Sequence, residues 1–139
     1  MSKVFFDTNI LVYCLDRHNS RKQEIARAIL RKAAAEATGV VSTQVLQEFY
    51  VVATRKLNVD PLAAKEMMLA FSNLGLVTVS AEIIATAIDC SILNRIPFWD
   101  GLIIAAAEKA ACTTLLTEDL NDGQIIKGIR TVNPFAGTW

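Results

Sequence analysis

Residues 4–9, which read VFFDTN, place a carboxylate at the end of a short apolar run. The first three of these residues are β-branched or aromatic, which is typical of a buried strand, and the run ends on Asp7. An ionised aspartate in apolar surroundings is unfavourable unless a cation or hydrogen-bond donors meet it. Asp7 therefore either caps a helix that begins in the following ILVYCL segment or holds a ligand.

Short β-rich runs alternate with longer helical stretches along the rest of the chain. The predicted strands cover residues 3–6, 39–42, 76–80, 113–117 and 129–132. The predicted helices cover residues 20–37, 43–57, 61–73, 81–94 and 100–111. This alternation is typical of a parallel sheet with helices on both faces. We therefore expect an α/β fold, built on a central parallel sheet, in a single domain that covers residues 1–139.

The composition indicates a compact protein without disulfides. With 53% apolar residues, a chain of 139 residues can bury a sizeable core. The 14 basic and 14 acidic residues cancel, so the net charge gives no argument for nucleic-acid binding. The three cysteines lie far apart among apolar residues, which favours reduced, buried thiols: Cys14, Cys90 and Cys112. Neither a membrane-spanning run nor a signal-peptide pattern is present, so we expect a cytoplasmic protein without membrane contact.

Acidic residues recur at the predicted ends of strands and helices. Asp7 ends the first strand, Asp119 follows TTLLT by two residues, and Asp100 lies in PFWDG before an apolar helix. Ligands of parallel α/β sheets bind beyond the carboxyl ends of the strands. Glu48, in TQVLQEFYVVATRK, lies at the margin of the apolar face of its helix. Four acids brought together at this edge would repel one another unless a cation joined them.

The types of residue present limit the chemistry of such a site. Carboxylates without a cluster of His or Cys favour Mg²⁺ or Mn²⁺ over zinc. The single histidine, His18, lies in the polar stretch DRHNSRK, and the six glycines form no phosphate-binding loop of a known type. The remaining candidate reaction is metal-assisted attack by water on a phosphodiester, because ions held by carboxylates activate water and neutralise the charge of the phosphate.

Three segments carry a resemblance to a known family: VFFDTNILVYCLD, VVSTQVLQEFYVVATRK and IPFWDGLIIAAAEKAACTTLLTEDLNDGQ. Together they resemble a PIN domain, specifically the VapC type of toxin ribonuclease from prokaryotic toxin–antitoxin pairs. The resemblance covers essentially the whole chain. It implies Mg²⁺- or Mn²⁺-dependent endoribonuclease cleavage of structured RNA, carried out by a homodimer that an antitoxin silences.

The resemblance also implies roles for individual residues. Asp7 and Asp100 would be direct metal ligands, Glu48 would bind through water or orient the nucleophile, and Asp119 would be the fourth acid. Four polar residues would hold these carboxylates by hydrogen bonds: Thr8, Asn9, Ser42 and Thr117. The segment TEDLNDG offers further acids, of which Asp122 is a possible additional member of the site. The predicted strand end favours Asp119, and Asp122 lies in an apparent turn.

Two other functions stay open. A catalytically inactive PIN-like module would bind RNA or protein without cutting it. A receiver-type signalling domain also has a parallel sheet and an acidic Mg²⁺ pocket. Such a domain needs adjacent acids after its first strand, whereas Asp7 is followed by Thr8, so the sequence disfavours it.

Residues 17–32 hold six basic residues but only one acid, Glu24. Such a segment is either a solvated helix face or a surface that binds RNA or a protein partner. Apolar residues recur in it at helical spacing: Ile25, Ala26, Ile29 and Leu30. These side chains either pack on the sheet or contribute to a groove for a partner helix.

Overall fold

The structure is a computed structural model that describes residues 2–137. Within these residues, six strands form one sheet in the order β3-β2-β1-β4-β6-β5. The strands are β1 (Lys3–Phe6), β2 (Gly39–Ser42), β3 (Gly75–Val77), β4 (Cys112–Leu116), β5 (Ile125–Ile126) and β6 (Ile129–Val132). All neighbouring strands pair in parallel except β5 and β6.

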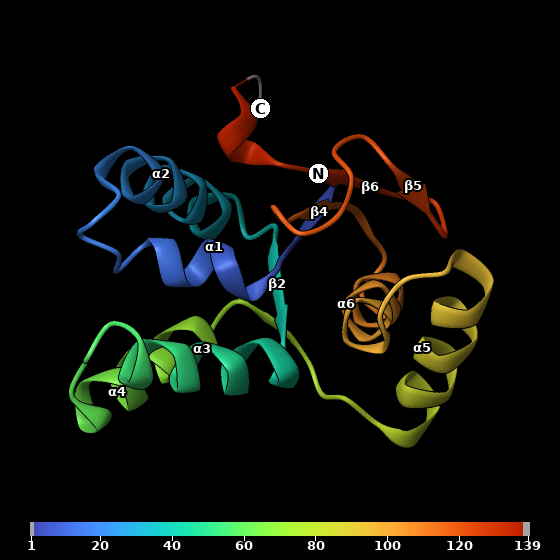
Figure 1. The fold of residues 1–139 in the computed structure, drawn as a ribbon, viewed down its shortest axis with the longest axis horizontal. Helices are drawn as coiled ribbons and strands as arrows, with labels where there is room; N and C mark the ends of the chain where they lie inside the picture. Colours follow the sequence, from blue (N-terminus) through green and yellow to red (C-terminus); the bar gives the residue numbers. More distant parts are fainter. Residues whose placement is uncertain (1, 138–139) are drawn as a thin grey trace.

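Helices cover both faces of the sheet, with α1 to α4 on one side and α5 and α6 on the other (Figure 1). They are α1 (Thr8–Tyr13), α2 (Ser20–Glu36), α3 (Thr43–Arg55), α4 (Pro61–Phe71), α5 (Ala81–Asn94) and α6 (Phe98–Lys109), followed by the 3₁₀ turn η1 (Pro134–Ala136). In the part of the chain that the structure describes, none of these helices combines the length and apolar character needed to cross a membrane. The α/β fold predicted from the sequence is confirmed.

The centre of the sheet is parallel, as predicted, and only one edge departs from this arrangement. β5 pairs antiparallel with β6, with Ile126 opposite Ile129. The two residues between them, Lys127 and Gly128, both have positive φ (52° and 76°). This is the backbone conformation that a tight two-residue hairpin requires, and glycine adopts it without strain. The strand β5 has only two residues, too few for the alternating pattern on which strand prediction depends.

Two predicted elements also differ at their ends. The strand expected over residues 76–80 ends at Val77, because the Ser80 hydroxyl accepts the Ile83 N–H and caps α5. The helix expected to begin at Asp100 begins at Phe98, so Asp100 lies in its first turn. Acidic residues in a first turn are favoured by the helix dipole.

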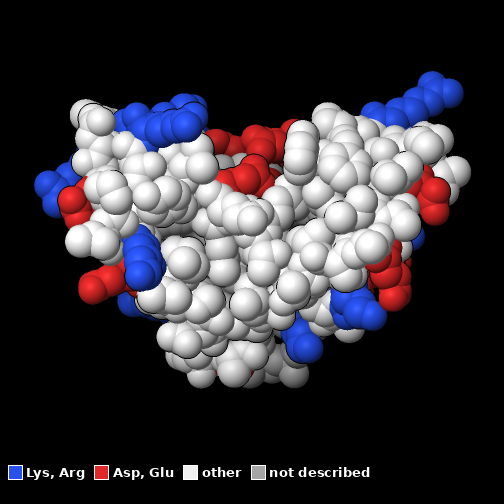
Figure 2. All heavy atoms as spheres, turned by 90° about the horizontal axis from the view of Figure 1, so that it is seen from below, with Lys and Arg blue, Asp and Glu red and all other residues white. Residues whose placement is uncertain are grey.

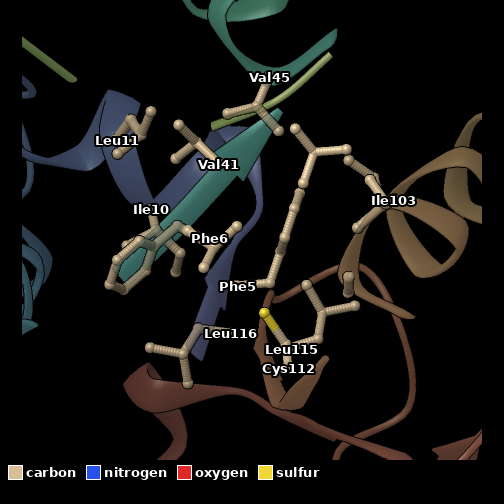
Figure 3. Close-up of a cluster of buried hydrophobic side chains, with 14 of the residues drawn as sticks. Phe5, Phe6, Ile10, Leu11, Val41, Val45, Ile103, Cys112, Leu115 and Leu116 are labelled. Atoms are coloured by element: carbon tan, nitrogen blue, oxygen red, sulfur yellow. The ribbon is translucent and has the colours of Figure 1, made fainter. Parts of the chain in front are cut away.

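The core is built around β1, whose two phenylalanines point to opposite faces of the sheet (Figure 3). Phe6 points toward Ile10 of α1, whereas Phe5 points toward Ile103 of α6 and Leu115 of β4. Neither phenylalanine is exposed to solvent. Because β1 is buried on both faces, its position at the centre of the sheet is set by packing, and Asp7 is carried to the edge at the end of this strand.

The cysteines are buried and free, which confirms the prediction of reduced thiols. Burial is the largest cause that raises the pKa of Cys14 to about 12 and that of Cys112 to about 11. Both thiols therefore stay protonated at neutral pH and behave as apolar groups.

The basic segment at residues 17–32 lies largely on α2, and its apolar face packs on the protein's own sheet. Ala26 and Ile29 are buried in the core. Several basic side chains bind within the fold: Arg21 donates to Phe135 O, Arg27 donates to Cys14 O, and Lys22 pairs with Glu118. The segment is therefore not a uniformly solvated face, and the half-buried Ile25 lines a surface pocket together with Ala28 and Pro134.

The position of Asp100 depends on a close approach between α5 and α6. A Cβ atom added at Gly101 would lie 2.7 Å from the carbonyl oxygen of Ala87 in α5. No side chain other than the hydrogen of glycine fits between the two helices at this point. The first turn of α6, which carries Asp100, is thereby held against the backbone of α5.

We expect Gly101→Ala to destabilise the fold. Alanine is favoured over glycine in a helix by about 1 kcal/mol, but overpacking against backbone that cannot rotate away costs roughly 1–3 kcal/mol. The free energy of unfolding, measured by urea denaturation, should therefore fall. Lys109→Ala, at an exposed position of the same helix, is the control and should change it by less than about 0.5 kcal/mol. Equal stability of the two variants would contradict the close approach.

Candidate functional site

The carboxyl ends of β1 and β4 bring Asp7 and Thr117 together at the centre of the sheet. The two strands pair in parallel with Phe6 opposite Leu116, so the next residue of each lies at the same edge. The Thr117 hydroxyl donates to Asp7 Oδ2 over 2.7 Å, and the backbone N–H of Thr8 donates to Asp7 Oδ1 over 2.7 Å. Asp7 thus caps α1 and also faces the edge of the sheet where ligands of α/β folds bind.

Two hydrogen bonds link Asp119 to residues beside Asp7, namely Asn9 and Thr117. Asn9 Nδ2 of α1 donates to Asp119 Oδ2 over 3.2 Å. The backbone N–H of Asp119 donates to Thr117 Oγ1 over 3.1 Å. Thr117 therefore contacts both acids, because its hydroxyl donates to one carboxylate and accepts from the backbone of the other residue. These bonds fasten the loop after β4 to the first turn of α1.

The helices α3 and α6 contribute the other two acids. Glu48 lies on the exposed side of α3, one turn after Gln44, and Asp100 is half-buried in the first turn of α6. Gln44 Nε2 donates to Trp99 O over 3.2 Å and so ties α3 to the start of α6. Figure 2 shows acidic side chains gathered in a hollow of the molecular surface, between two lobes.

Desolvation and the charges of neighbouring acids raise the pKa of three of the four acids, Asp7, Glu48 and Asp100. Burial raises the pKa of Asp7 to about 6; its hydrogen bonds oppose this shift, and the charges of Asp119 and Glu48 add to it. The pKa of Glu48 is raised first by desolvation and then by the charges of Asp100 and Asp119, while the nearby Gln44 amide lowers it. The pKa of Asp100 is raised by burial and by Asp119. The four carboxylates therefore form one electrostatic group, and a cation among them would oppose every one of these shifts.

The donor set fits a hard divalent cation. Every candidate ligand is an oxygen, which suits Mg²⁺ or Mn²⁺. Among the described residues, three buried side-chain oxygens at this site have no hydrogen-bond partner: Thr8 Oγ1, Asn9 Oδ1 and Gln44 Oε1. Over residues 2–137, no group of three or more His, Cys, Asp or Glu side chains is placed so that together they could hold a metal ion. Mg²⁺ usually keeps several water molecules and binds through one or two carboxylates, so its binding does not require three such side chains in one cluster.

The polar residues implied to hold the acids contribute in different ways. Asn9 and Thr117 contact acids through their side chains, whereas Thr8 does so through its backbone N–H. Ser42 makes no hydrogen bond to the four acids in the described part of the chain. Its hydroxyl accepts the Val45 N–H and caps α3, so Ser42 fixes the helix that carries Glu48.

Of the three acids in TEDLNDG, only Asp119 joins the group. Asp122 Oδ1 accepts the backbone N–H of Asn133 over 2.9 Å, which agrees with the turn expected there. The Glu118 carboxylate accepts hydrogen bonds from Tyr13 and Lys22.

Sequence reasoning missed Gln44, Tyr13 and Lys22. Tyr13 and Lys22 meet Glu118 across 105 and 96 residues of chain, so no local pattern indicates these contacts. For Gln44, the spacing of four residues before Glu48 was a usable signal, because residues four apart share one face of a helix.

We expect the metal-free protein to gain stability as the pH falls from 7 to 5. The pKa of Asp7 in the folded state, about 6, lies above its ordinary value of 3.8, so the folded state binds this proton first. At pH 7 the ionised Asp7 carboxylate therefore lowers the free energy of unfolding by on the order of 3 kcal/mol. Protonation of Asp7 in the folded state restores about half of this loss at pH 5. Urea denaturation in EDTA measures this, and Asp7→Asn should remove most of the pH dependence. A wild-type protein whose stability is constant or falls over this range would contradict the assignment.

Several solved structures have a similar fold. One is the VapC20 toxin of Mycobacterium tuberculosis, described as cleaving the Sarcin-Ricin loop, with TM-score 0.63, 18% identity and coverage of 92% of this chain and 99% of that chain. Another is a toxin–antitoxin complex from Klebsiella pneumoniae, with TM-score 0.67, 23% identity and coverage of 95% and 98%. A third is DNA-bound VapBC from Salmonella typhimurium, with TM-score 0.65, 20% identity and coverage of 94% and 97%.

Comparison with curated proteins found no significant match. Among family models, that of the PIN domain matches residues 4–122. This match extends from β1 through the loop after β4 and includes all four acids, which confirms the resemblance found in the sequence. The chain therefore belongs to the PIN domain family.

Proposed function

We propose that this protein is a Mg²⁺- or Mn²⁺-dependent endoribonuclease and the VapC-type toxin of a type II toxin–antitoxin pair. The group of four carboxylates that act on one another electrostatically, Asp7, Glu48, Asp100 and Asp119, carries this proposal. An oxygen-lined site of this kind suits metal-assisted phosphodiester hydrolysis. The fold shared with VapC20, described as a Sarcin-Ricin loop cleaving toxin, supports RNA as the substrate.

Each acid has a distinct part in this proposal. Asp7, whose orientation is set by two hydrogen bonds, would hold the ion directly together with Asp100. Glu48 is exposed, so a water molecule has room beside it, and its carboxylate would orient that water and accept its proton. Asp119 would complete the ring from the side of the loop after β4. When bound, the ion would lower the pKa of water and offset the charge of the phosphate.

A catalytically inactive PIN-like module that binds RNA or protein is the second candidate. The observation that favours it is that, within residues 2–137, no group of three or more His, Cys, Asp or Glu side chains is placed to hold a metal ion. The receiver-type alternative is wrong, because the chain belongs to the PIN family.

Protein partners also follow from the proposed function. The fold shared with a toxin–antitoxin complex supports an antitoxin that blocks the site. Exposed isoleucines recur every four residues along α5, at Ile84, Ile88 and Ile92, and this stripe supports a homodimer. A ribonuclease that acts on cellular RNA under such control would work in the cytoplasm.

We expect cleavage of RNA to require Mg²⁺ or Mn²⁺ and to stop in EDTA. Asp7→Asn, Asp100→Asn and Asp119→Asn should each lower kcat at least about 100-fold, since each removes a charge from the site. Glu48→Gln should lower kcat at saturating metal and leave KM nearly unchanged. Asp122→Asn is the matched control and should cleave like the wild type, because this residue binds the backbone of a turn.

Purified protein incubated with total tRNA and rRNA, with fragments resolved on gels, provides the measurement. Circular dichroism of each variant confirms that the fold is retained. Undiminished cleavage in EDTA, or an Asp122→Asn variant more impaired than Asp119→Asn, would contradict this assignment of the acids. RNA binding without cleavage by the wild-type protein would support the inactive module.

We expect co-expression with the product of a small upstream reading frame to yield a complex that contains two copies of this chain. A tag on one protein should retain both, and light scattering gives the mass. Ile88→Arg should dissociate the two copies, because it places charge in the apolar stripe of α5. Ile125→Arg, at an exposed position of β5, is the control and should leave the mass unchanged. Failure to co-purify, together with harmless expression of this chain alone, would argue against a toxin.

A further inference from the structure

The loop between β4 and β5 carries three acids with three different sets of partners. Asp122 binds the backbone of Asn133, Asp119 binds Asn9, and Glu118 binds Tyr13 and Lys22. The proposed catalytic group uses only Asp119. Glu118 therefore needs an explanation of its own, because it is adjacent to a site acid and is directed into the protein.

Both carboxylate oxygens of Glu118 accept hydrogen bonds from side chains of the helices α1 and α2. Oε1 accepts from the Tyr13 hydroxyl over 2.6 Å, and Oε2 accepts from Lys22 Nζ over 2.8 Å. Lys22 Nζ also donates to the Tyr13 hydroxyl over 3.2 Å, which closes a ring of three groups. Charge-assisted bonds of this length are the stronger class of hydrogen bond. The charge of Lys22 therefore offsets that of Glu118, whereas Asp119 stays exposed to solvent.

Two aromatic rings hold the lysine of this cluster in place. Lys22 Nζ lies 4.7 Å from the centroid of the Tyr13 ring and 5.3 Å from that of Phe135. The two rings meet edge-on with centroids 5.0 Å apart. Arg21 of α2 donates to Phe135 O over 2.8 Å, which fixes the second ring. An exposed ion pair contributes little to stability. Here the charged side chains of Lys22 and Glu118 are each only about a quarter exposed. The cluster also joins four parts of the fold, α1, α2, the loop after β4 and η1.

Asp119 has few constraints of its own. It is exposed, and its carboxylate is held by one bond of 3.2 Å from Asn9. Asn9 and Tyr13 are four residues apart on α1 and so lie on the same face of that helix. One helix face thus binds Asp119 and Glu118 side by side. Because the two acids are adjacent in the chain, fixing Glu118 limits where the Asp119 carboxylate can move.

We propose that Glu118 is a positioning residue, which with Tyr13 and Lys22 forms a clamp that holds the Asp119 carboxylate in register with the other site acids. This inference rests on the proposed function, since it concerns the cation affinity of the same site. The three side chains of the clamp bond to one another, and none of these bonds is to one of the four site acids. Its contribution is to reduce the freedom of Asp119 before a divalent cation binds.

Binding of Mn²⁺, followed by the electron paramagnetic resonance signal of the free ion without RNA, tests this proposal. Glu118→Gln should weaken Mn²⁺ binding by about tenfold, the lower range for loss of a group that supports a metal ligand. Lys22→Met should act in the same direction, and Lys22→Arg, which keeps the charge, should recover most of the affinity. The ion pair Lys127–Glu108, at 3.5 Å and near the far end of α6, supplies the control. Glu108→Gln should bind Mn²⁺ like the wild type.

A second measurement separates positioning from a general loss of stability. In an Asp119→Asn background, Glu118→Gln should have almost no further effect on Mn²⁺ affinity, because the group that the clamp positions is already lost. Additive effects of the two changes, or unchanged Mn²⁺ affinity in Glu118→Gln, would overturn the proposal. If Glu118→Gln fails to fold, the same comparison is made with Tyr13→Phe, which removes a single hydroxyl.

The wild-type control distinguishes the two levels of inference. A wild-type protein that binds no Mn²⁺ overturns the proposed metal site and the clamp with it. If the wild-type protein binds Mn²⁺ and Glu118→Gln binds it with the same affinity, the clamp alone is overturned. Wild-type binding that is weakened by Glu118→Gln, in a protein that cuts no RNA, overturns the nuclease function and supports the clamp.

Discussion

The hydrogen bond from the Thr117 hydroxyl to Asp7, at the paired ends of β1 and β4, is the contact on which the site depends. It forms because two parallel strands end in register, one on an aspartate and the other on a threonine. The same hydroxyl oxygen accepts the Asp119 N–H, so a single side chain positions parts of two acids. Packing of Phe5 and Phe6 on opposite faces of β1 keeps this pair of strands at the centre of the sheet.

The short helix α1 converts the end of β1 into one wall of the site. Asp7 caps this helix, Asn9 in its first turn binds Asp119, and Tyr13 in its last turn binds Glu118. A helix of six residues is too short to be stable by itself, so it depends on the cap and on the sheet beneath it. Its stability and the arrangement of the acids are therefore coupled, because the same carboxylate serves both.

The surroundings of the acids oppose folding. Desolvation and like charges raise the pKa of Asp7, Glu48 and Asp100, so the ionised forms of these side chains are less favourable in the folded protein than in the unfolded chain. A protein retains such an arrangement where binding of a cation or a cationic group offsets the repulsion. Buried oxygens without donors, at Thr8, Asn9 and Gln44, indicate the same tension between folding and binding. Within residues 2–137, the three buried side-chain oxygens and nitrogens without a hydrogen-bond partner thus all belong to residues near the acids.

The sequence by itself determined the α/β class and most of the strands and helices, and it singled out the four acids as candidates, because apolar periodicity and the residues at strand ends are local features. Asp7 could be singled out since a carboxylate that ends an apolar run needs a local explanation. Only the tertiary structure decided that Gln44 binds Trp99 O and that Glu118 turns away from the acids toward Tyr13 and Lys22. These outcomes depend on contacts between distant parts of the chain. The local sequence does not show which of several polar residues will meet, because strand register and helix packing bring them together only in the folded protein.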